Sequence, residues 1–266
     1  GELLRVVDIE GSSRLLLDVA FHPITRELLV VDFGAAKVLK VNPRTGASRV
    51  FTTIPTVVAG PGLNDLAFDK RGNVYISDSF QGIIWRTGPA GKNLVEWVRD
   101  PLLTTTGVPP FGVNGLAFNK HGDTLFATNT GNDTVIKIPV MADGTHGTPE
   151  VFAHSVNGAA SLRIDEDDNL WICAAQADEI VVLDKTGRVI AKLGDFDGIS
   201  RRGAPRGLLF PVSLVRVEEW IYVTNLSFDI RFFGLPQAVD SQWAAQVTRH
   251  TVSRLKGRIP PVRGLP

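Results

Sequence analysis

The stretch LNDLAFDKRGNVYISDSFQGIIWR, residues 63–86, decides the fold. It contains three short runs rich in β-branched and aromatic residues, NDLAF, NVYISD and GIIWR, separated by turn-forming sequences that end in glycine. Runs of this length and composition, bounded by such turns, are typical of β-strands joined by hairpins. A fourth run, NLVEWV, follows after Gly-Pro-Ala-Gly, so the segment predicts a four-stranded antiparallel meander.

The same pattern recurs five times along the chain. Equivalent apolar residues mark the five copies, at spacings of 47, 50, 46 and 52 residues; they are Val19, Leu66, Leu116, Leu162 and Leu214. Periods of about 40 to 50 residues are typical of β-propeller blades. The repeats therefore predict an all-β fold, a β-propeller of five four-stranded antiparallel blades, with residues 1–266 forming a single domain.

The two ends of the chain bear on how the ring closes. The N-terminal GELLRVVDI has the pattern of a fourth strand, and the fifth module lacks a fourth strand before the proline-rich tail IPPVRGLP. We expect the N-terminal strand to join the last blade, because a strand lent in this way leaves no long unpaired edge. The alternative is a ring of six blades, with a divergent blade within residues 225–266.

Charge and composition bear on the class of partner. The 266 residues carry 28 Lys+Arg and 28 Asp+Glu, and no block of like charges marks a nucleic-acid or membrane surface. No apolar run approaches the roughly 18 residues that span a bilayer. We therefore expect a small-molecule ligand rather than nucleic acid or membrane as partner, with the oligomeric state left open. The start at Gly-Glu suits a mature product or a trimmed chain, and we expect a secreted or periplasmic rather than a cytoplasmic location.

Long connections at one end of the predicted propeller collect the candidate site residues. Residues 98–112, 194–210 and 225–245 form irregular segments there, whereas the opposite end carries short turns, and long loops on a rigid scaffold commonly bind ligands. The candidate substrate-binding residues around this mouth are Asn129, Asn225, Phe228, Arg231 and Phe233.

Two equivalent asparagines, Asn64 and Asn114, open the channel-lining strands of the second and third modules. Their side chains offer neutral oxygen ligands or hydrogen bonds to a substrate, and a tie to the local backbone is the alternative. The candidate catalytic residues are His154, as a general base beside the channel, and the carboxylate of Asp65.

The modules GLNDLAFDKRGNVYISDS, GVNGLAFNKHGDTLFATNTGNDTVIKI and DEDDNLWICAAQADEIVVLD resemble those of the senescence-marker-protein (SMP-30) and gluconolactonase-like propellers, and more distantly NHL-repeat propellers. The resemblance covers roughly residues 16–225. It implies a small-molecule hydrolase of lactonase or esterase type. It also implies a single divalent cation, Ca²⁺ or a similar ion, held in the channel by a Glu, two Asn and an Asp.

Carried over position by position, that metal-binding set is incomplete. The two Asn fall on Asn64 and Asn114, whereas the Glu position falls on Leu17 and the Asp position on Ala160. Calcium takes six to eight oxygen ligands, charged ones among them, so two neutral amides form a poor site.

Two alternatives to a hydrolase therefore stay open. One is a metal-free propeller that binds or cyclises a hydrophobic small molecule, as strictosidine-synthase-like proteins do, because Leu17, Val212 and the aromatic run 228–233 suit an apolar ligand. The other is a non-enzymatic, NHL-like interaction propeller that uses its loop-rich face. Whether the protein is an enzyme is left open between them, a lactonase or ester hydrolase being the enzymatic interpretation.

Overall fold

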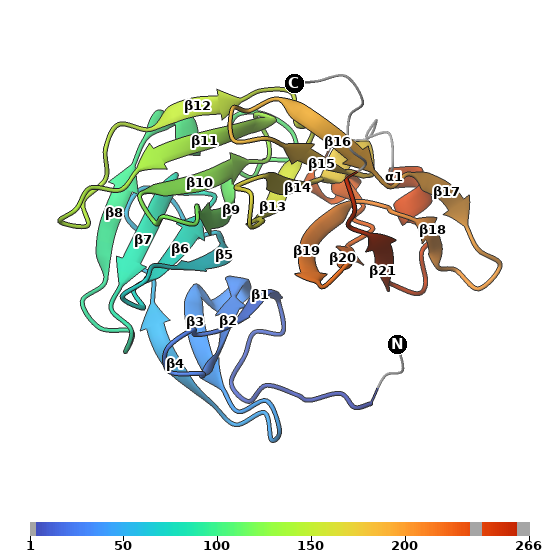
Figure 1. Ribbon diagram of the computed structural model, residues 1–266. Helices are drawn as coiled ribbons and strands as arrows, with labels where there is room; N and C mark the ends of the chain where they lie inside the picture. Colours follow the sequence, from blue (N-terminus) through green and yellow to red (C-terminus); the bar gives the residue numbers. More distant parts are fainter. Residues whose placement is uncertain (1–3, 235–240, 260–266) are drawn as a thin grey trace.

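Five antiparallel β-sheets stand around a common centre in the computed structural model, which describes residues 4–234 and 241–259 (Figure 1). The prediction of an all-β propeller with five modules is confirmed. Within the described ranges, no helix is long and apolar enough to cross a membrane.

Blades 1 to 4 each contain four consecutive strands, paired in chain order. Their bounds are β1 (Leu16–Phe21), β2 (Leu28–Asp32), β3 (Lys37–Val41) and β4 (Ser48–Thr53) in blade 1; β5 (Leu63–Phe68), β6 (Val74–Asp78), β7 (Ile83–Thr87) and β8 (Val95–Arg99) in blade 2; β9 (Val113–Phe118), β10 (Thr124–Asn129), β11 (Thr134–Pro139) and β12 (Glu150–Ala153) in blade 3; and β13 (Ala159–Ile164), β14 (Leu170–Ala174), β15 (Glu179–Leu183) and β16 (Val189–Leu193) in blade 4.

Blade 5 contains three strands among the described residues, β19 (Pro211–Val217), β20 (Trp220–Asn225) and β21 (Thr251–Lys256). A two-stranded hairpin, β17 (Phe196–Ile199) and β18 (Pro205–Gly207), precedes it. The short helical turns are η1 (Phe33–Ala35), η2 (Pro101–Leu103), η3 (Ala175–Ala177), η4 (Ile230–Phe233) and α1 (Ser241–Ala244).

The first strand of each blade lies innermost and contacts the first strand of the next blade, from β1 through β5, β9 and β13 to β19. In every blade the pairing of this strand with the second one shifts register near its second and third residues. Such bulges re-aim side chains and are common beside functional sites. The repeated bulge therefore gives five equivalent backbone positions, one near the beginning of each inner strand.

Most of the core consists of apolar clusters that join successive blades, and a smaller cluster lies within blade 1. One cluster joins Tyr75 and Trp97 of blade 2 to Leu116 of blade 3, and Tyr75 meets the ring of Phe118 edge-on at 4.9 Å. Similar clusters join blades 1 and 2, 3 and 4, and 4 and 5. Each blade is thus stabilised mainly by burial of apolar area against its neighbours.

The predicted closure by the N-terminal strand is wrong for the described residues. Residues 4–15 form no strand, and the segment bonds instead to the β3–β4 turn of blade 1: Glu10 N donates to Gly46 O at 3.1 Å, and Arg5 Nη2 to Pro43 O at 3.2 Å. Binding to the β3–β4 turn closes a shorter loop of chain than pairing with the edge of blade 5 would. Closing a shorter loop costs less conformational entropy, which favours the observed position of the segment. An opening separates blade 1 from blade 5, and the N-terminal segment runs beside it (Figure 1).

Candidate functional site

Asn64 lies at the bulge of β5, half-buried, with its amide nitrogen held by a hydroxyl. Its Nδ2 donates to Ser79 Oγ at 2.6 Å, and Ser79 Oγ donates in turn to Val113 O of the next blade at 2.6 Å. The bond fixes the orientation of the side chain.

Asn114 repeats this arrangement on β9 of blade 3. Its Nδ2 donates to Thr130 Oγ1 at 2.9 Å, and Thr130 Oγ1 donates to Ala159 O of blade 4 at 2.8 Å. Among the described residues, no group donates to Oδ1 of either asparagine. The two equivalent amides therefore present free acceptor oxygens on neighbouring inner strands, each with one N–H left over.

Two carboxylates occupy the next position along β1 and β5. Asp65 is buried; its Oδ1 accepts from Leu66 N at 2.9 Å and its Oδ2 from Leu116 N at 3.0 Å, so it ties blade 2 to blade 3. Asp18 Oδ2 accepts from the same Leu66 N at 3.1 Å. The guanidinium of Arg163, on β13, reaches Asp65 Oδ2 at 3.5 Å.

The ionisation of two of these groups, Asp18 and Arg163, is shifted by their surroundings. Burial, followed by the negative charge of Asp65, raises the pKa of Asp18 well above its usual range. The pKa of Arg163 is raised although its own burial opposes this, because the carboxylates of Asp65 and Asp18 favour the cation. Asp18 and Asp65 thus share a site in which one carboxyl keeps its proton more readily than a free aspartate does.

The residues around the two asparagines do not fit a calcium site. Leu17 and Ala160 hold the equivalent positions on β1 and β13 and offer no side-chain oxygen. The carboxylates of the two aspartates are bonded to backbone amides at the blade junctions. No group of three or more His, Cys, Asp or Glu side chains able to hold a metal occurs in the described part of the chain.

Two predicted substrate-binding residues, Asn129 and Asn225, are buried anchors for loops. Asn129 Nδ2 donates to Leu102 O at 2.9 Å and to Thr104 O at 2.8 Å, which holds the connection from blade 2 to blade 3. Asn225 Oδ1 accepts from Leu209 N at 3.1 Å at the entry to blade 5. Their side chains shape the mouth by holding its loops, and a direct contact with substrate stays a prediction.

The other predicted substrate-binding residues lie around blade 5. Phe228 is half-buried and packs on Phe210, with ring centroids 6.0 Å apart. Arg231 is exposed and pairs with Asp229, its Nε donating to Asp229 Oδ1 at 2.8 Å, a contact that raises the pKa of the guanidinium. Phe233 ends η4, and its side chain lies outside the described part of the structure.

The predicted catalytic histidine lies on a connection between blades. His154 is exposed between β12 and β13. Within the described ranges, no hydrogen bond joins it to Asn64, Asn114 or Asp65. Its role as a general base therefore stays a prediction.

An aromatic cluster on the same end of the propeller was not predicted from the sequence. Phe80 stacks on Phe111 with ring centroids 5.5 Å apart and meets Phe33 edge-on at 5.7 Å. Phe80 directly follows Ser79, the partner of Asn64. Its ring packs against the backbone of Gly62, where a larger residue would displace the ring. The signal in the sequence was a phenylalanine in each of two turns where polar residues are the norm.

Comparisons with known proteins give one family match. The sequence model described as the SMP-30/Gluconolactonase/LRE-like region matches residues 20–194. Lactonase drp35 of Staphylococcus saprophyticus is 25% identical over 144 residues, which cover 49% of this chain and 41% of that protein. The chain thus spans about two fifths of the length of the curated relatives it matches.

Solved structures with the same fold are more distant in sequence. A luciferin-regenerating enzyme superposes with a TM-score of 0.65 at 15% identity, over 91% of this chain and 78% of that one. A regucalcin from Agrobacterium tumefaciens, described as a calcium-binding protein, gives 0.59 at 16% identity, over 94% and 79%. These likenesses support the fold alone.

Proposed function

The chain belongs to the SMP-30/gluconolactonase/LRE-like family, and we propose that it hydrolyses a small lactone or ester bound at Asn64 and Asn114. The lactonase named among its relatives supports the reaction type. The main observation in support of this proposal is the repeated arrangement of the two asparagines. In each, a hydroxyl accepts from the amide nitrogen, and the amide oxygen stays free.

This arrangement suits a polar cyclic ester. The free amide oxygens accept hydrogen bonds from substrate hydroxyls, and the remaining N–H of each amide donates to an ester carbonyl. A donor that is held in place and aimed at a carbonyl stabilises the negative charge that develops there during hydrolysis. The two side chains can therefore orient a lactone and polarise its reacting bond.

Proton transfer is assigned within this proposal to Asp65 and His154. Asp65 adjoins Asn64, and backbone amides fix its carboxylate. His154 is exposed on the connection from β12 to β13, and within this proposal it acts as the general base for the attacking water. The divalent cation implied by the family has no part in the proposal, because the equivalent positions on β1 and β13 carry apolar side chains.

A second candidate, binding without hydrolysis, rests on the aromatic cluster. Phe80 is 39% exposed although it stacks on Phe111, so part of an aromatic surface faces solvent beside Asn64. Such a surface with a few polar groups suits an organic ligand. This candidate predicts affinity without turnover.

The test is hydrolysis of a panel of aldonolactones, alkyl lactones and aryl esters, measured with and without a chelator. We expect turnover that resists chelation, and a fall in kcat/KM of about 100-fold in Asn64→Ala and in Asn114→Ala. Asn42→Ala is the matched control, because Asn42 serves the β3–β4 turn at the other end of blade 1. The hydrolase proposal fails if no member of the panel turns over, or if both variants keep full activity.

A further inference from the structure

Phe80 carries an exposed ring on a fixed turn beside Asn64. It lies between β6 and β7, is 39% exposed, and directly follows Ser79, whose hydroxyl accepts from the amide of Asn64. Ser79 N donates to Gly62 O at 2.8 Å, and the ring rests on the backbone of Gly62, two residues before Asn64. The ring therefore has a defined place close to the proposed substrate site.

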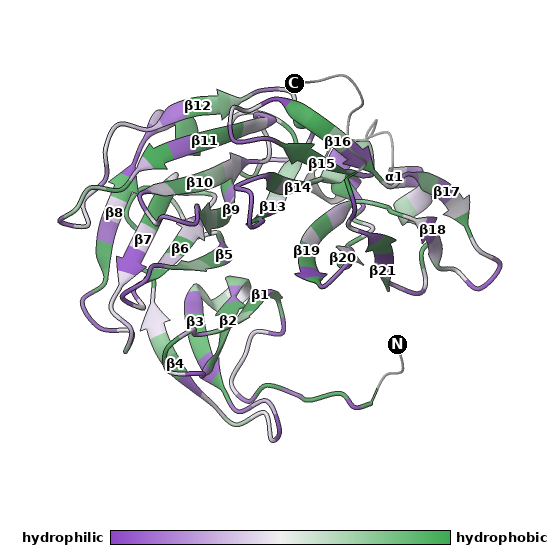
Figure 2. Cartoon of the chain, viewed as in Figure 1, coloured by the Kyte–Doolittle hydropathy of each residue, from purple (hydrophilic) through white to green (hydrophobic). Residues whose placement is uncertain are grey.

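Two further rings extend this surface over the neighbouring blades. Phe33, from η1 of blade 1, meets Phe80 edge-on at 5.7 Å, and Phe111, from the connection between blades 2 and 3, stacks on it at 5.5 Å. Hydrophobic residues colour the strands of the ring, where the blades pack on one another (Figure 2). These three rings stand instead in turns and connections, and Phe80 leaves part of their row open to solvent.

The connection from blade 1 to blade 2 brings exposed valines to the same turn. Gln81, which follows Phe80, is buried, and its Oε1 accepts from Val57 N at 2.6 Å and from Val58 N at 3.1 Å. Its Nε2 donates to Pro55 O at 2.9 Å. Val57 and Val58 are 48% and 61% exposed. One buried side chain thus holds this connection against the turn that carries the ring.

The corresponding turn of blade 3 offers no such surface. A hydroxyl accepts from Asn114 as one does from Asn64, but the residue after that hydroxyl is Gly131. A Cβ on Gly131 would lie 2.6 Å from both Pro109 O and Thr105 Oγ1, so polar atoms close off this position. The two amides are therefore equivalent, whereas their surroundings are apolar beside Asn64 and polar beside Asn114.

We propose that the row of three rings binds an apolar substituent of the substrate, an alkyl or aryl group attached to the lactone or ester. This inference rests on the hydrolase proposal above and adds the class of substrate to it: a cyclic ester that is polar at one end and apolar at the other. When the polar end lies at the two amides, the apolar group lies over Phe80, because the turn after Asn114 has no apolar surface to offer. Burial of that group gives binding energy that a purely polar lactone does not obtain.

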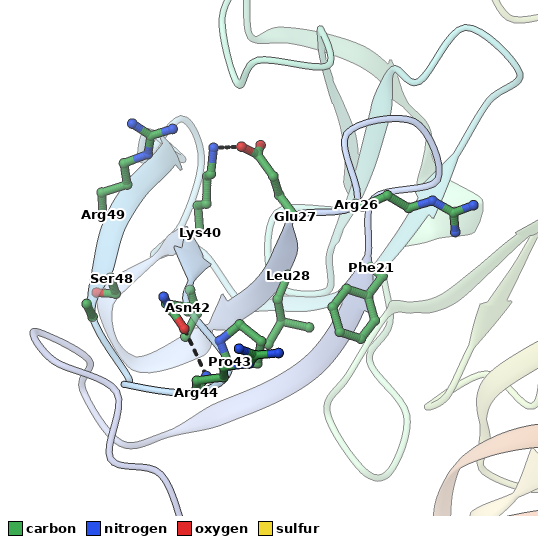
Figure 3. A pocket seen from close by; sticks show the side chains of 12 residues that line it. Phe21, Arg26, Glu27, Leu28, Lys40, Asn42, Pro43, Arg44, Ser48 and Arg49 are labelled. Carbon is green, nitrogen blue, oxygen red and sulfur yellow. Dashed lines mark hydrogen bonds and ion pairs between the residues drawn. The ribbon is translucent and has the colours of Figure 1, made fainter.

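A hollow in blade 1 is a poor place for the same substituent. It has a volume of about 570 Å³ and lies by the β3–β4 turn, at the other end of the blade (Figure 3). Charged side chains line it, among them Arg26, Glu27, Lys40 and Arg49, and Lys40 forms an ion pair with Glu27. An apolar group that entered the hollow would remove water from these charges at a cost in free energy.

The test compares γ-lactones that carry a methyl, a propyl or a hexyl substituent. We expect kcat/KM to rise about twofold per added methylene, and so about 30-fold from methyl to hexyl, because a group resting on an open surface buries roughly half of its area. Phe80→Ala should lower this hexyl-to-methyl ratio to about 5 or less, since most of the apolar contact is lost. A variant that only folds less well loses activity on all three lactones alike and keeps the ratio.

Two further variants show whether the ring itself is responsible. Phe80→Leu keeps an apolar side chain and should retain part of the dependence on chain length. Phe21→Ala is the matched control, because Phe21 is also an exposed phenylalanine, 59% exposed, but lies at the other end of blade 1 and lines the hollow there. It should leave the ratio unchanged.

The affinities of the corresponding γ-lactams, which are not cleaved, separate this inference from the hydrolase proposal. If the lactones turn over with a ratio near one, or if Phe80→Ala keeps the wild-type ratio, the substituent site is overturned and the hydrolase proposal stands. If no lactone turns over, yet lactam affinity rises with chain length and Phe80→Ala removes the rise, the hydrolase proposal fails and the substituent site stands. The absence of both turnover and lactam binding overturns both.

Discussion

Strands β1 and β9 are copies of one inner strand that meet different surroundings. At the second position β9 carries Asn114 and β1 carries Leu17; at the fourth, Leu116 is 2% exposed and Val19 is 60% exposed. The backbone is the same in both, including the bulge. The comparison shows that the module fixes where a side chain stands, while the neighbouring blades decide whether that side chain is buried.

The largest effect on stability is expected from substitutions at the fourth residue of these two strands. Leu116→Asp places an unpaired carboxylate between two blades, and we expect it to lower the free energy of unfolding by about 4 kcal/mol or more. Val19→Asp changes an exposed position, so its effect stays within about 1 kcal/mol. Urea unfolding of both variants measures the difference. Equal losses would show that β1 is covered in solution.

The next effect concerns the third position, where β1 carries Asp18 and β9 carries Gly115. Because burial and Asp65 raise the pKa of Asp18 in the folded protein, the folded state binds this proton more tightly than the unfolded chain does. The free energy of unfolding should therefore fall as pH rises from about 4 through the raised pKa, with a slope of up to about 1.4 kcal/mol per pH unit.

Asp18→Asn removes that dependence, because its neutral amide replaces the protonated carboxyl and still accepts from Leu66 N. Urea unfolding between pH 4 and pH 9 should show the variant gaining on the wild-type protein as pH rises. A constant difference between the two proteins would mean that Asp18 ionises normally.

The smallest effect is expected from a substitution at the second residue of β1. Leu17→Glu gives β1 the carboxylate that the family resemblance places there, next to the asparagine-bearing strands. We expect millimolar calcium to raise the melting temperature of this variant by a few degrees and to leave the wild-type protein unchanged. A calcium-dependent rise in the wild-type protein would contradict the view that its ligand set is incomplete.

The repeat pattern made the architecture predictable because each strand and turn is a local feature. The apolar positions from Val19 to Leu214 recur every 46 to 52 residues, and the structure places all five on inner strands. The position of Asn64 and Asn114 at one end of these strands followed from the same alignment. The position of the N-terminal segment was not predictable, because it depends on which partner the segment meets in three dimensions.

The roles of polar residues near the mouth were harder to predict for a related reason. Asn225 and Asn64 both stand at strand ends, yet the side chain of Asn225 bonds to the entry of blade 5, whereas the oxygen of Asn64 is free. Hydrogen-bond partners of this kind come from distant segments and leave no local signature. The ring cluster around Phe80 likewise joins three separate connections whose meeting depends on the order of the blades.

The most direct test of the central claim follows the side-chain amide resonances of the asparagines in ¹⁵N–¹H spectra while an uncleaved lactam analogue of the lactone is added. Single Asn→Ala substitutions assign the resonances. The account predicts that the signals of Asn64 and Asn114 shift together along one saturation curve, while the signal of Asn42 stays in place. Saturable binding that leaves both signals unmoved would contradict it.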